Sequence, residues 1–179
     1  MVERILLLTG APGSGKTTVL RQVAAALPHA RLCGFLTEEI CSRGRRSGFR
    51  LTPFDGQVVT LAHVNLRSPH RVGKYGVDLG ALEKVSETAL GVEENALYLV
   101  DEIGKMECRS ARFVEAMRRL FESGRPVVAT IALHGGGFIA EAKRLANRTL
   151  WEVNRANRED MPGRVLRWLA ERAFWPAGH

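Results

Sequence analysis

The sequence predicts an α/β fold: a mostly parallel sheet with helices on both faces and an antiparallel β insertion at about residues 41–64. Short apolar runs alternate with helical patterns along most of the chain, which is typical of strands that pair in parallel. A glycine-rich stretch joins the first apolar run to the first helix. Between residues 41 and 64, turn residues separate short extended runs, which favours hairpins.

Length and composition indicate one globular domain, which we expect to span residues 1–173 and to end in a loose tail at 174–179. The chain has 179 residues, of which 45% are hydrophobic and 25% charged. No apolar run approaches the roughly 20 residues of a membrane helix, and the first residues lack the features of a signal peptide. Three scattered cysteines, without zinc-ligand spacing, favour core positions in a reducing compartment. We therefore expect a cytoplasmic protein without membrane association.

The first half of the chain contains three elements of the parallel framework. A continuous apolar run at 4–9 predicts a central strand covered on both faces. Apolar residues at helical spacing predict a helix over 16–27, which a proline ends. A second strand is predicted at 32–40. The hairpins follow, and 72–77 is another short extended segment.

The second half alternates regularly. Asp78 is a candidate N-cap for a helix whose apolar residues extend to Leu90. The other elements follow from the same patterns: strands at 96–100, 126–133 and 150–153, and helices around 113–121, 138–145 and 165–169.

The stretch GAPGSGKT matches the pattern G-x-x-x-x-G-K-[ST] at every fixed position, between a strand and a helix. Its residues are Gly10, Ala11, Pro12, Gly13, Ser14, Gly15, Lys16 and Thr17. In such a loop backbone N–H groups surround a phosphate, and the glycines leave room for it. Lys16 is placed to reach the β- and γ-phosphates, and the Thr17 hydroxyl to bind Mg²⁺. A glycine-rich turn without a ligand is the weaker interpretation.

Two acids, Asp101 and Glu102, follow an apolar strand. Ligands of open α/β sheets bind at this end of the strands. Asp101 is the candidate Mg²⁺ ligand, and Glu102 the candidate to orient or deprotonate water. Paired acids are also common where a helix begins, but the phosphate loop on another strand favours hydrolysis, with Lys16 and Glu102 as catalytic residues. Lys105 either neutralises phosphate charge or is a solvated surface residue.

Several blocks occur in an order that resembles the small nucleoside-triphosphatases related to the human cancer-related nucleoside-triphosphatase. The resemblance extends from the first strand to about residue 160. The phosphate loop is shared by many proteins, whereas GF-x-TEE, VGKY and DEIGKME are much more specific. The blocks lie at residues 10–18, 34–40, 44–49, 72–75, 100–107 and 129–131.

The resemblance implies a P-loop fold of the RecA or AAA+ type. It also implies slow, Mg²⁺-dependent hydrolysis of nucleoside triphosphates such as ATP, GTP, CTP and UTP, with broad base tolerance, to the diphosphate and phosphate. The family's second nucleotide-binding segment corresponds here to Val100, Asp101, Glu102, Ile103, Gly104, Lys105, Met106 and Glu107.

One segment departs from the family pattern. Where the family typically reads T-R/K-E-N-R near its C-terminus, residues 153–158 keep the basic residues and the asparagine but replace the threonine and the glutamate. Arg155 and Arg158 either stabilise transition-state charge, as arginine fingers do, or lie on a helix surface.

Five residues in the resembling blocks keep two interpretations each. Thr37, Glu38 and Glu39, at the end of a predicted strand, either lie near the γ-phosphate or belong to a strand edge with solubilising acids. Lys74 and Tyr75 either line the nucleotide pocket, with the tyrosine stacked on a base, or simply pack within a strand.

The net charge of +7, from 26 basic and 19 acidic residues, is compatible with polyanion binding. One local cluster exists, at Arg43, Arg45, Arg46 and Arg50. The spread of the other charges favours a small phosphate-bearing ligand over dedicated nucleic-acid binding. Two alternatives to a hydrolase remain: a kinase of nucleosides, nucleotides or polynucleotides, in which Glu102 deprotonates an acceptor hydroxyl, and a nucleotide-operated RNA-binding switch that uses the arginine cluster.

Overall fold

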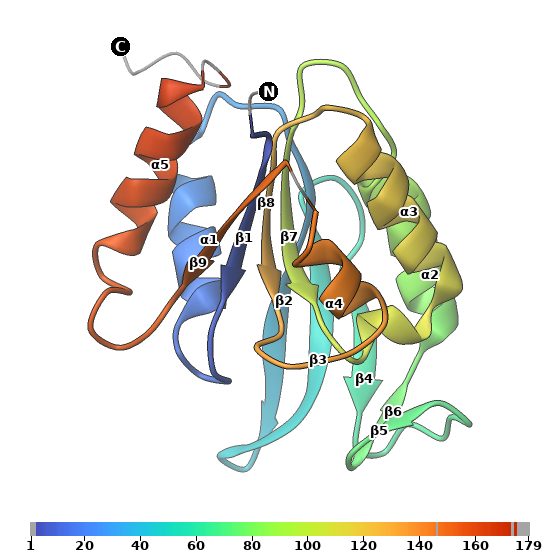
Figure 1. Ribbon diagram of the computed structural model, residues 1–179. Helices are drawn as coiled ribbons and strands as arrows, with labels where there is room; N and C mark the ends of the chain where they lie inside the picture. The colour runs from blue at the N-terminus through green and yellow to red at the C-terminus, as the bar shows by residue number, and fades with distance from the viewer. Residues whose placement is uncertain (1–2, 146, 173, 175–179) are drawn as a thin grey trace.

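The computed structural model describes residues 3–145, 147–172 and 174, and there strands and helices alternate as predicted. Within this part of the chain the strands form one nine-stranded sheet in the order β5-β6-β4-β3-β2-β7-β8-β1-β9 (Figure 1). The strands are β1 (Ile5–Thr9), β2 (Leu32–Ser42), β3 (Arg45–Pro53), β4 (Val59–His63), β5 (Arg71–Val72), β6 (Tyr75–Val77), β7 (Leu97–Ile103), β8 (Val127–Ile131) and β9 (Arg148–Glu152). The helices are α1 (Lys16–Ala25), α2 (Leu79–Ala89), α3 (Ala111–Glu122), α4 (Phe138–Ala142), α5 (Met161–Glu171) and the 3-10 helix η1 (Glu107–Arg109).

The sheet is mixed: the predicted α/β framework with an antiparallel insertion is present, but more of its strands are antiparallel than predicted. Strands β2, β7, β8, β1 and β9 run parallel, whereas β3, β4, β6 and β5 add to β2 in antiparallel fashion. The reason lies in β2, which pairs in parallel with β7 over Leu32–Phe35 and then continues as one arm of the hairpin with β3. The hairpins of residues 41–64 therefore extend the same sheet, and the antiparallel part continues to Val77.

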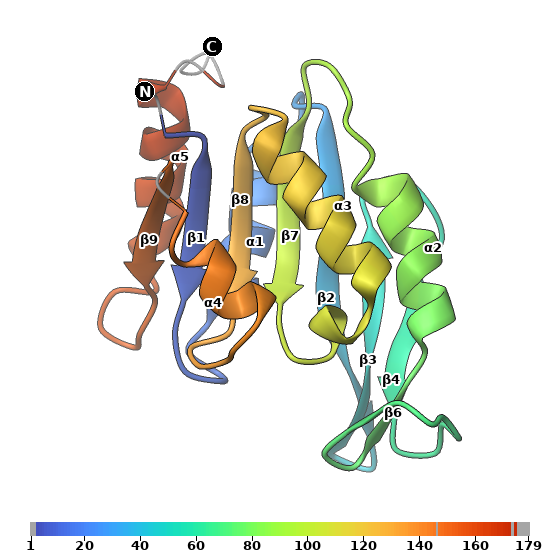
Figure 2. The same ribbon diagram turned by 45° about the vertical axis from the view of Figure 1, so that its right-hand side comes forward.

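Helices cover both faces of the sheet, as predicted. Helices α1 and α5 pack on one face, and α2, α3 and α4 on the other (Figures 1 and 2). Along β1, Ile5 and Leu7 belong to the core under α2–α4, whereas Leu6 and Leu8 belong to the core under α1 and α5. This burial on both faces explains why the strand is a continuous apolar run without alternation.

The predicted N-cap of α2 is confirmed, because the Asp78 carboxylate accepts a hydrogen bond from the Ala81 backbone N–H at 2.9 Å. Of the three cysteines expected in the core, Cys33 is buried but Cys41 is exposed, and all three are free thiols. Apart from Phe174, the expected tail at 174–179 lies outside the described residues. In the described part of the chain, no helix has the length and apolar character needed to cross a membrane.

Candidate active site

The glycine-rich loop and the acidic strand end meet at the carboxyl edge of the parallel strands. The loop leads from β1 to Lys16, the first residue of α1, while Asp101 and Glu102 lie near the end of β7. Strand β8 separates β1 from β7 in the sheet, so the two segments flank its end. The Lys16 Nζ atom lies 3.9 Å from Glu102 Oε2, which joins the two segments directly.

The loop keeps space and hydrogen-bonding capacity. At Gly10, with φ +151°, a Cβ atom would lie 2.3 Å from the Val153 carbonyl oxygen, so the close approach of these two segments requires glycine. At Gly13, with φ +74°, a Cβ atom would meet no described atom within 4 Å. The Ser14 Oγ atom is buried without a hydrogen-bond partner among the described residues. A buried, unsatisfied hydroxyl costs free energy unless it finds a partner, so this loop is built for a polar ligand.

The Lys16 side chain lies across this loop. Only 7% of the residue is exposed, and Nζ donates hydrogen bonds to the carbonyl oxygens of Gly10 at 2.9 Å and Ala11 at 3.3 Å. Its ammonium group therefore lies between the loop backbone and the carboxylate of Glu102.

Asp101 is buried, with 1% of its surface exposed, and its oxygens are held from three sides. Oδ1 accepts a hydrogen bond from the Thr130 hydroxyl at 2.6 Å, and Oδ2 accepts one from the Thr37 N–H at 3.2 Å. The Thr37 hydroxyl also donates to the Asp101 backbone carbonyl. Burial raises the pKa of Asp101, while hydrogen bonds from Thr130, Thr17 and Thr37 and the charge of Lys16 lower it. The Thr17 hydroxyl therefore lies close to the Asp101 carboxylate.

Glu102 and Glu107 lie on either side of Gly104. A Cβ atom at Gly104 would lie 2.8 Å from Glu107 Oε2 and 3.0 Å from Glu102 Oε1. Burial raises the pKa of Glu102, the charge of Lys16 lowers it, and that of Asp101 raises it. Burial, followed by the charge of Glu102, raises the pKa of Glu107 to about 8. Glu107 is therefore mostly a neutral acid at pH 7 and lies close to Glu102.

The other residues of the segment 100–107 differ in burial and in the parts of the protein that they contact. Val100 and Ile103 belong to the core under α2–α4, and Met106 packs against it while partly exposed. Lys105 is exposed to solvent. The structure therefore brings the carboxylates of this segment to the loop and leaves the apolar side chains in a packing role.

Two side chains at this site were not singled out as functional by the sequence patterns. Thr130 lies fully buried in β8 and donates a hydrogen bond to Asp101; the signals for it are a lone hydroxyl within an apolar strand and its place in the block at 129–131. Lys143 follows α4, and its Nζ donates to the carbonyl oxygens of Ala132 at 2.6 Å and Leu133 at 2.7 Å, just beyond β8. Burial and the charge of Lys16 lower the pKa of Lys143, so a second ammonium group lies near the first.

The structure separates the two candidate arginines. Arg158 lies against the loop, because a Cβ atom at Gly15 would be 3.2 Å from its Cδ, and its Nε donates to Glu159 at 3.2 Å. Arg155 is exposed elsewhere on the same connection between β9 and α5. A cavity of about 280 Å³ beside the loop is lined by Gly15, Thr18, Val19, Gln22, Arg158 and Glu159.

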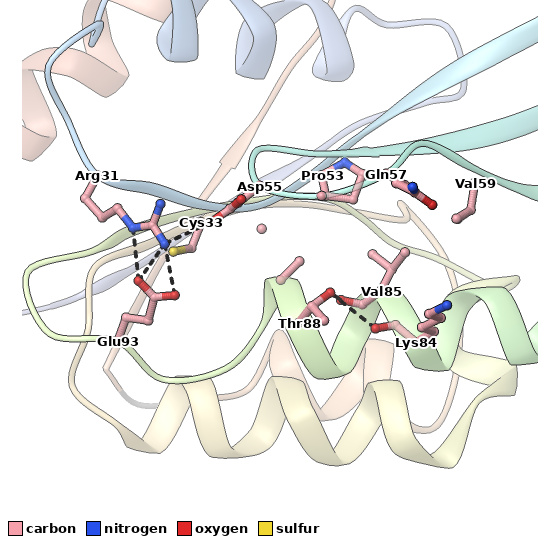
Figure 3. Close-up of a pocket in the computed structure, with 13 residues that line it drawn as sticks. Arg31, Cys33, Pro53, Asp55, Gln57, Val59, Lys84, Val85, Thr88 and Glu93 are labelled. Atoms are coloured by element: carbon pink, nitrogen blue, oxygen red, sulfur yellow. Dashed lines mark hydrogen bonds and ion pairs between the residues drawn. The ribbon is translucent and has the colours of Figure 1, made fainter.

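A larger cavity, of about 540 Å³, lies away from this site. It opens between α2 and the strands β2 to β4, and none of the predicted site residues lines it (Figure 3). Arg31 lies at one end, where it donates to Glu93 and Asp55 (Figure 3). Cavity size alone would therefore point away from the residues predicted from the sequence.

Glu38 and Glu39 are engaged in ion pairs along the β2–β3 hairpin. Glu38 Oε2 lies 2.6 Å from Arg50 Nη2, and Glu39 Oε1 lies 3.1 Å from Arg46 Nη1. The expectation that these acids end a strand is wrong, because β2 continues to Ser42. The strand is longer because its second half is paired with β3.

Tyr75 packs within the sheet, as the second of its two interpretations predicted. Its ring lies 5.2 Å from that of Phe49, nearly edge-on, and both rings pack against the core under α2–α4. The Lys74 ammonium lies 5.4 Å from the centre of the Tyr75 ring.

A family model described as NTPase matches residues 5–166. The chain belongs to this NTPase family. A relative from Thermotoga sp. (strain RQ2), named nucleoside-triphosphatase THEP1, is 39% identical over 163 residues, which cover 90% of this chain and 92% of the relative. The human cancer-related nucleoside-triphosphatase is 34% identical over 89% of this chain and 93% of its own length. The predicted family resemblance is thereby confirmed.

Two solved structures of the family share the fold. The crystal structure of THEP1 from Aquifex aeolicus superimposes with a TM-score of 0.84 at 30% identity, over 92% of this chain and 98% of that chain. The solution structure of the human cancer-related nucleoside triphosphatase gives 0.82 at 29% identity, over 94% and 98% respectively.

Proposed function

We propose that the protein is a P-loop nucleoside-triphosphate phosphatase of the RecA or AAA+ type, formed as one domain over about residues 1–173. It converts nucleoside triphosphates to the diphosphate and phosphate. Membership of the NTPase family supports this proposal, and the relatives are named nucleoside-triphosphatases. The observation that carries it is the Lys16 ammonium, located between the loop carbonyls and Glu102.

The donor groups present fit Mg²⁺ as the cofactor. Asp101 and Thr17 supply a carboxylate and a hydroxyl, the hard oxygen ligands that Mg²⁺ prefers, and Mg²⁺ usually binds few protein groups together with substrate phosphates. The buried Asp101 carboxylate, whose pKa burial raises, favours a nearby cation. When bound, Mg²⁺ supplies a positive charge to the phosphate oxygens.

Residues of the protein bind the phosphates, position Asp101 and activate the water. The backbone N–H groups of residues 10–17, except Pro12, and the Lys16 ammonium bind the β- and γ-phosphates, and Thr130 and Thr37 hold Asp101 in place. Glu102 orients the attacking water and accepts its proton, while the solvent-exposed third of its side chain gives water access. Arg158, beside Gly15, is the arginine placed to contact the nucleotide.

Broad base tolerance and slow turnover are part of the proposal. The cavity beside Gly15 and Thr18, which we assign to the nucleoside end of the substrate, is lined by Val19 and by flexible side chains such as Gln22 and Arg158. Such a lining offers few fixed groups to discriminate one base from another. Three free thiols support a reducing compartment, and we propose the cytoplasm.

Phosphate release from ATP, GTP, CTP and UTP, with and without Mg²⁺, tests the proposal. We expect Mg²⁺-dependent release from all four at similar rates. The same assay includes nucleosides, nucleoside diphosphates and an RNA oligonucleotide as acceptors. Transfer of labelled phosphate to one of these in place of water would show a kinase, and release without Mg²⁺ would contradict the assigned metal ligands.

A further inference from the structure

Basic residues gather on the hairpins of the antiparallel part of the sheet. We call residues 41–52 and 61–77 the basic arm; they comprise the end of β2, β3 except its last residue, the second part of β4, and β5 and β6. These residues include seven Lys or Arg and no Asp or Glu, while four acids lie just outside these bounds, so the whole stretch 38–78 carries a formal charge of +3. The members are Arg43, Arg45, Arg46, Arg50, Arg67, Arg71 and Lys74.

The fold brings together residues that are distant in the sequence. Lys74 Nζ donates to the Arg46 carbonyl at 3.3 Å, and Arg71 Nη2 donates to the Lys74 carbonyl at 2.8 Å. The arginine cluster of the β2–β3 hairpin is therefore continuous with the β5–β6 hairpin, at the lower end of the molecule in both views (Figures 1 and 2). All seven basic residues are exposed.

Most of these charges lack an acidic partner. Arg46 and Arg50 pair with Glu39 and Glu38. In residues 3–145, 147–172 and 174, no carboxylate lies within 4.0 Å of the other five basic groups of the arm. Clustered like charges repel one another, so such a surface is more stable when a polyanion covers it.

The residue types of the basic arm favour nucleic acid over an anionic membrane as its ligand. Six of the seven cations are arginines, whose planar guanidinium groups bind phosphate oxygens in pairs. The large hydrophobic residues that are exposed in the described chain are Val58 and Val92, both outside the arm, so the arm lacks the apolar side chains that insert into membranes. Two partly exposed rings, Phe49 and Tyr75, lie among the cations, with Arg46 5.6 Å above Phe49.

We propose that the basic arm binds single-stranded nucleic acid, largely without sequence preference. The arginines bind successive phosphates, and the exposed edges of Phe49 and Tyr75, whose rings otherwise pack against the core, contact unpaired bases. The nucleic acid binds near the active site, since the five steps along β2 from Thr37, which contacts Asp101, to Ser42 span roughly 16 Å at the usual rise per residue. The proposal goes beyond nucleotide hydrolysis and does not depend on it.

Fluorescence anisotropy without nucleotide tests this binding. The probes are labelled oligouridylate and oligothymidylate of about 20 nucleotides, a length that exceeds common site sizes. We expect both to bind, with affinity that falls steeply as salt increases. The variant Arg45→Glu/Arg71→Glu should lose at least about tenfold in affinity, because it reverses two phosphate-binding charges. The matched control Arg119→Glu/Arg167→Glu makes the same charge change on α3 and α5 and should lose less than about threefold, through long-range repulsion alone.

The double variant Arg45→Gln/Arg71→Gln removes the two charges without reversing them, so it should disturb folding less. We expect its slope of log affinity against log salt to be shallower by roughly 1.4, at about 0.7 for each phosphate that the protein no longer neutralises. Phosphate release from ATP, unchanged in every variant, reports that the chain is folded. The proposal is wrong if neither oligonucleotide binds at low salt, or if the arm and control variants lose affinity equally. Tighter binding to duplex DNA or to vesicles of anionic lipid would likewise overturn it in favour of those partners.

Discussion

The two halves of the sheet place their polar residues in different ways. In the parallel half, β1 and β8 are buried along their full length, and the groups of the candidate active site lie at or just beyond strand ends. In the antiparallel half, exposed arginines and a lysine line the hairpins along their length. A strand covered by helices on both faces can offer polar groups only near its end, whereas a hairpin with an uncovered face can carry charge throughout. Chemistry and surface charge are therefore assigned to different halves of one sheet.

Lys16→Ala is the change with the largest expected effect. It removes the ammonium group that lies between the loop and Glu102, so both nucleotide binding and turnover should fail. We expect phosphate release to fall by about 10³-fold or more, and the affinity for a fluorescent nucleotide to fall as well. Lys74→Ala removes the same charge from the antiparallel half and should leave release unchanged. Equal losses in both variants would mean that the two halves do not differ in function.

Glu102→Gln should separate binding from turnover. The amide keeps the size of the side chain but cannot accept a proton from water, so release should fall by about 10²-fold while nucleotide affinity is retained. Glu39→Gln is the control, since its carboxylate pairs with Arg46 on the hairpin and an exposed ion pair contributes little. Undiminished release from Glu102→Gln would remove the assigned role.

Phe49→Ala tests whether the antiparallel half contributes stability without contributing to catalysis. The Phe49 ring joins β3 to β6 through Tyr75, and its loss should lower the free energy of unfolding by about 2 kcal/mol, less than for a fully buried phenylalanine. Urea titration measures the change. Phosphate release per folded molecule should not change, and a large loss there would show that packing of the hairpins positions the active site.

Glu107→Gln has the smallest expected effect, a change in how stability depends on pH. The folded-state pKa of Glu107 is raised to about 8 from an ordinary value of 4.5, so between these values the folded protein binds a proton that the unfolded chain has released. This group therefore makes stability fall as the pH rises from about 5 to 8. Thermal unfolding across that range should show a smaller fall in the variant. Glu122→Gln, at an exposed position of α3, should behave like the unchanged protein.

Local patterns were sufficient to predict most elements and the two segments of the candidate site. The phosphate loop, the two acids and the cap at Asp78 are each encoded within a few consecutive residues, although β7 extends through the acids to Ile103 and does not end before them as predicted. The roles of Thr130 and Lys143 could not be assigned in this way: Thr130 lies in one of the family blocks, but its contact with Asp101 depends on the order of the strands, and Lys143 lies in no motif. The paired state of Glu38 and Glu39 was equally hidden, since it depends on the register between β2 and β3.

The sequence by itself determined which segments are buried strands, which are helices, and where phosphate-binding and acidic groups end a strand, because these follow from the periodicity and chemistry of neighbouring residues. Tertiary structure alone decided that the hairpins extend the central sheet, that β8 lies between the two active-site segments, and that Arg71 and Lys74 join Arg46. Strand order and register depend on contacts between residues far apart in the chain, and a single sequence contains no local record of those contacts.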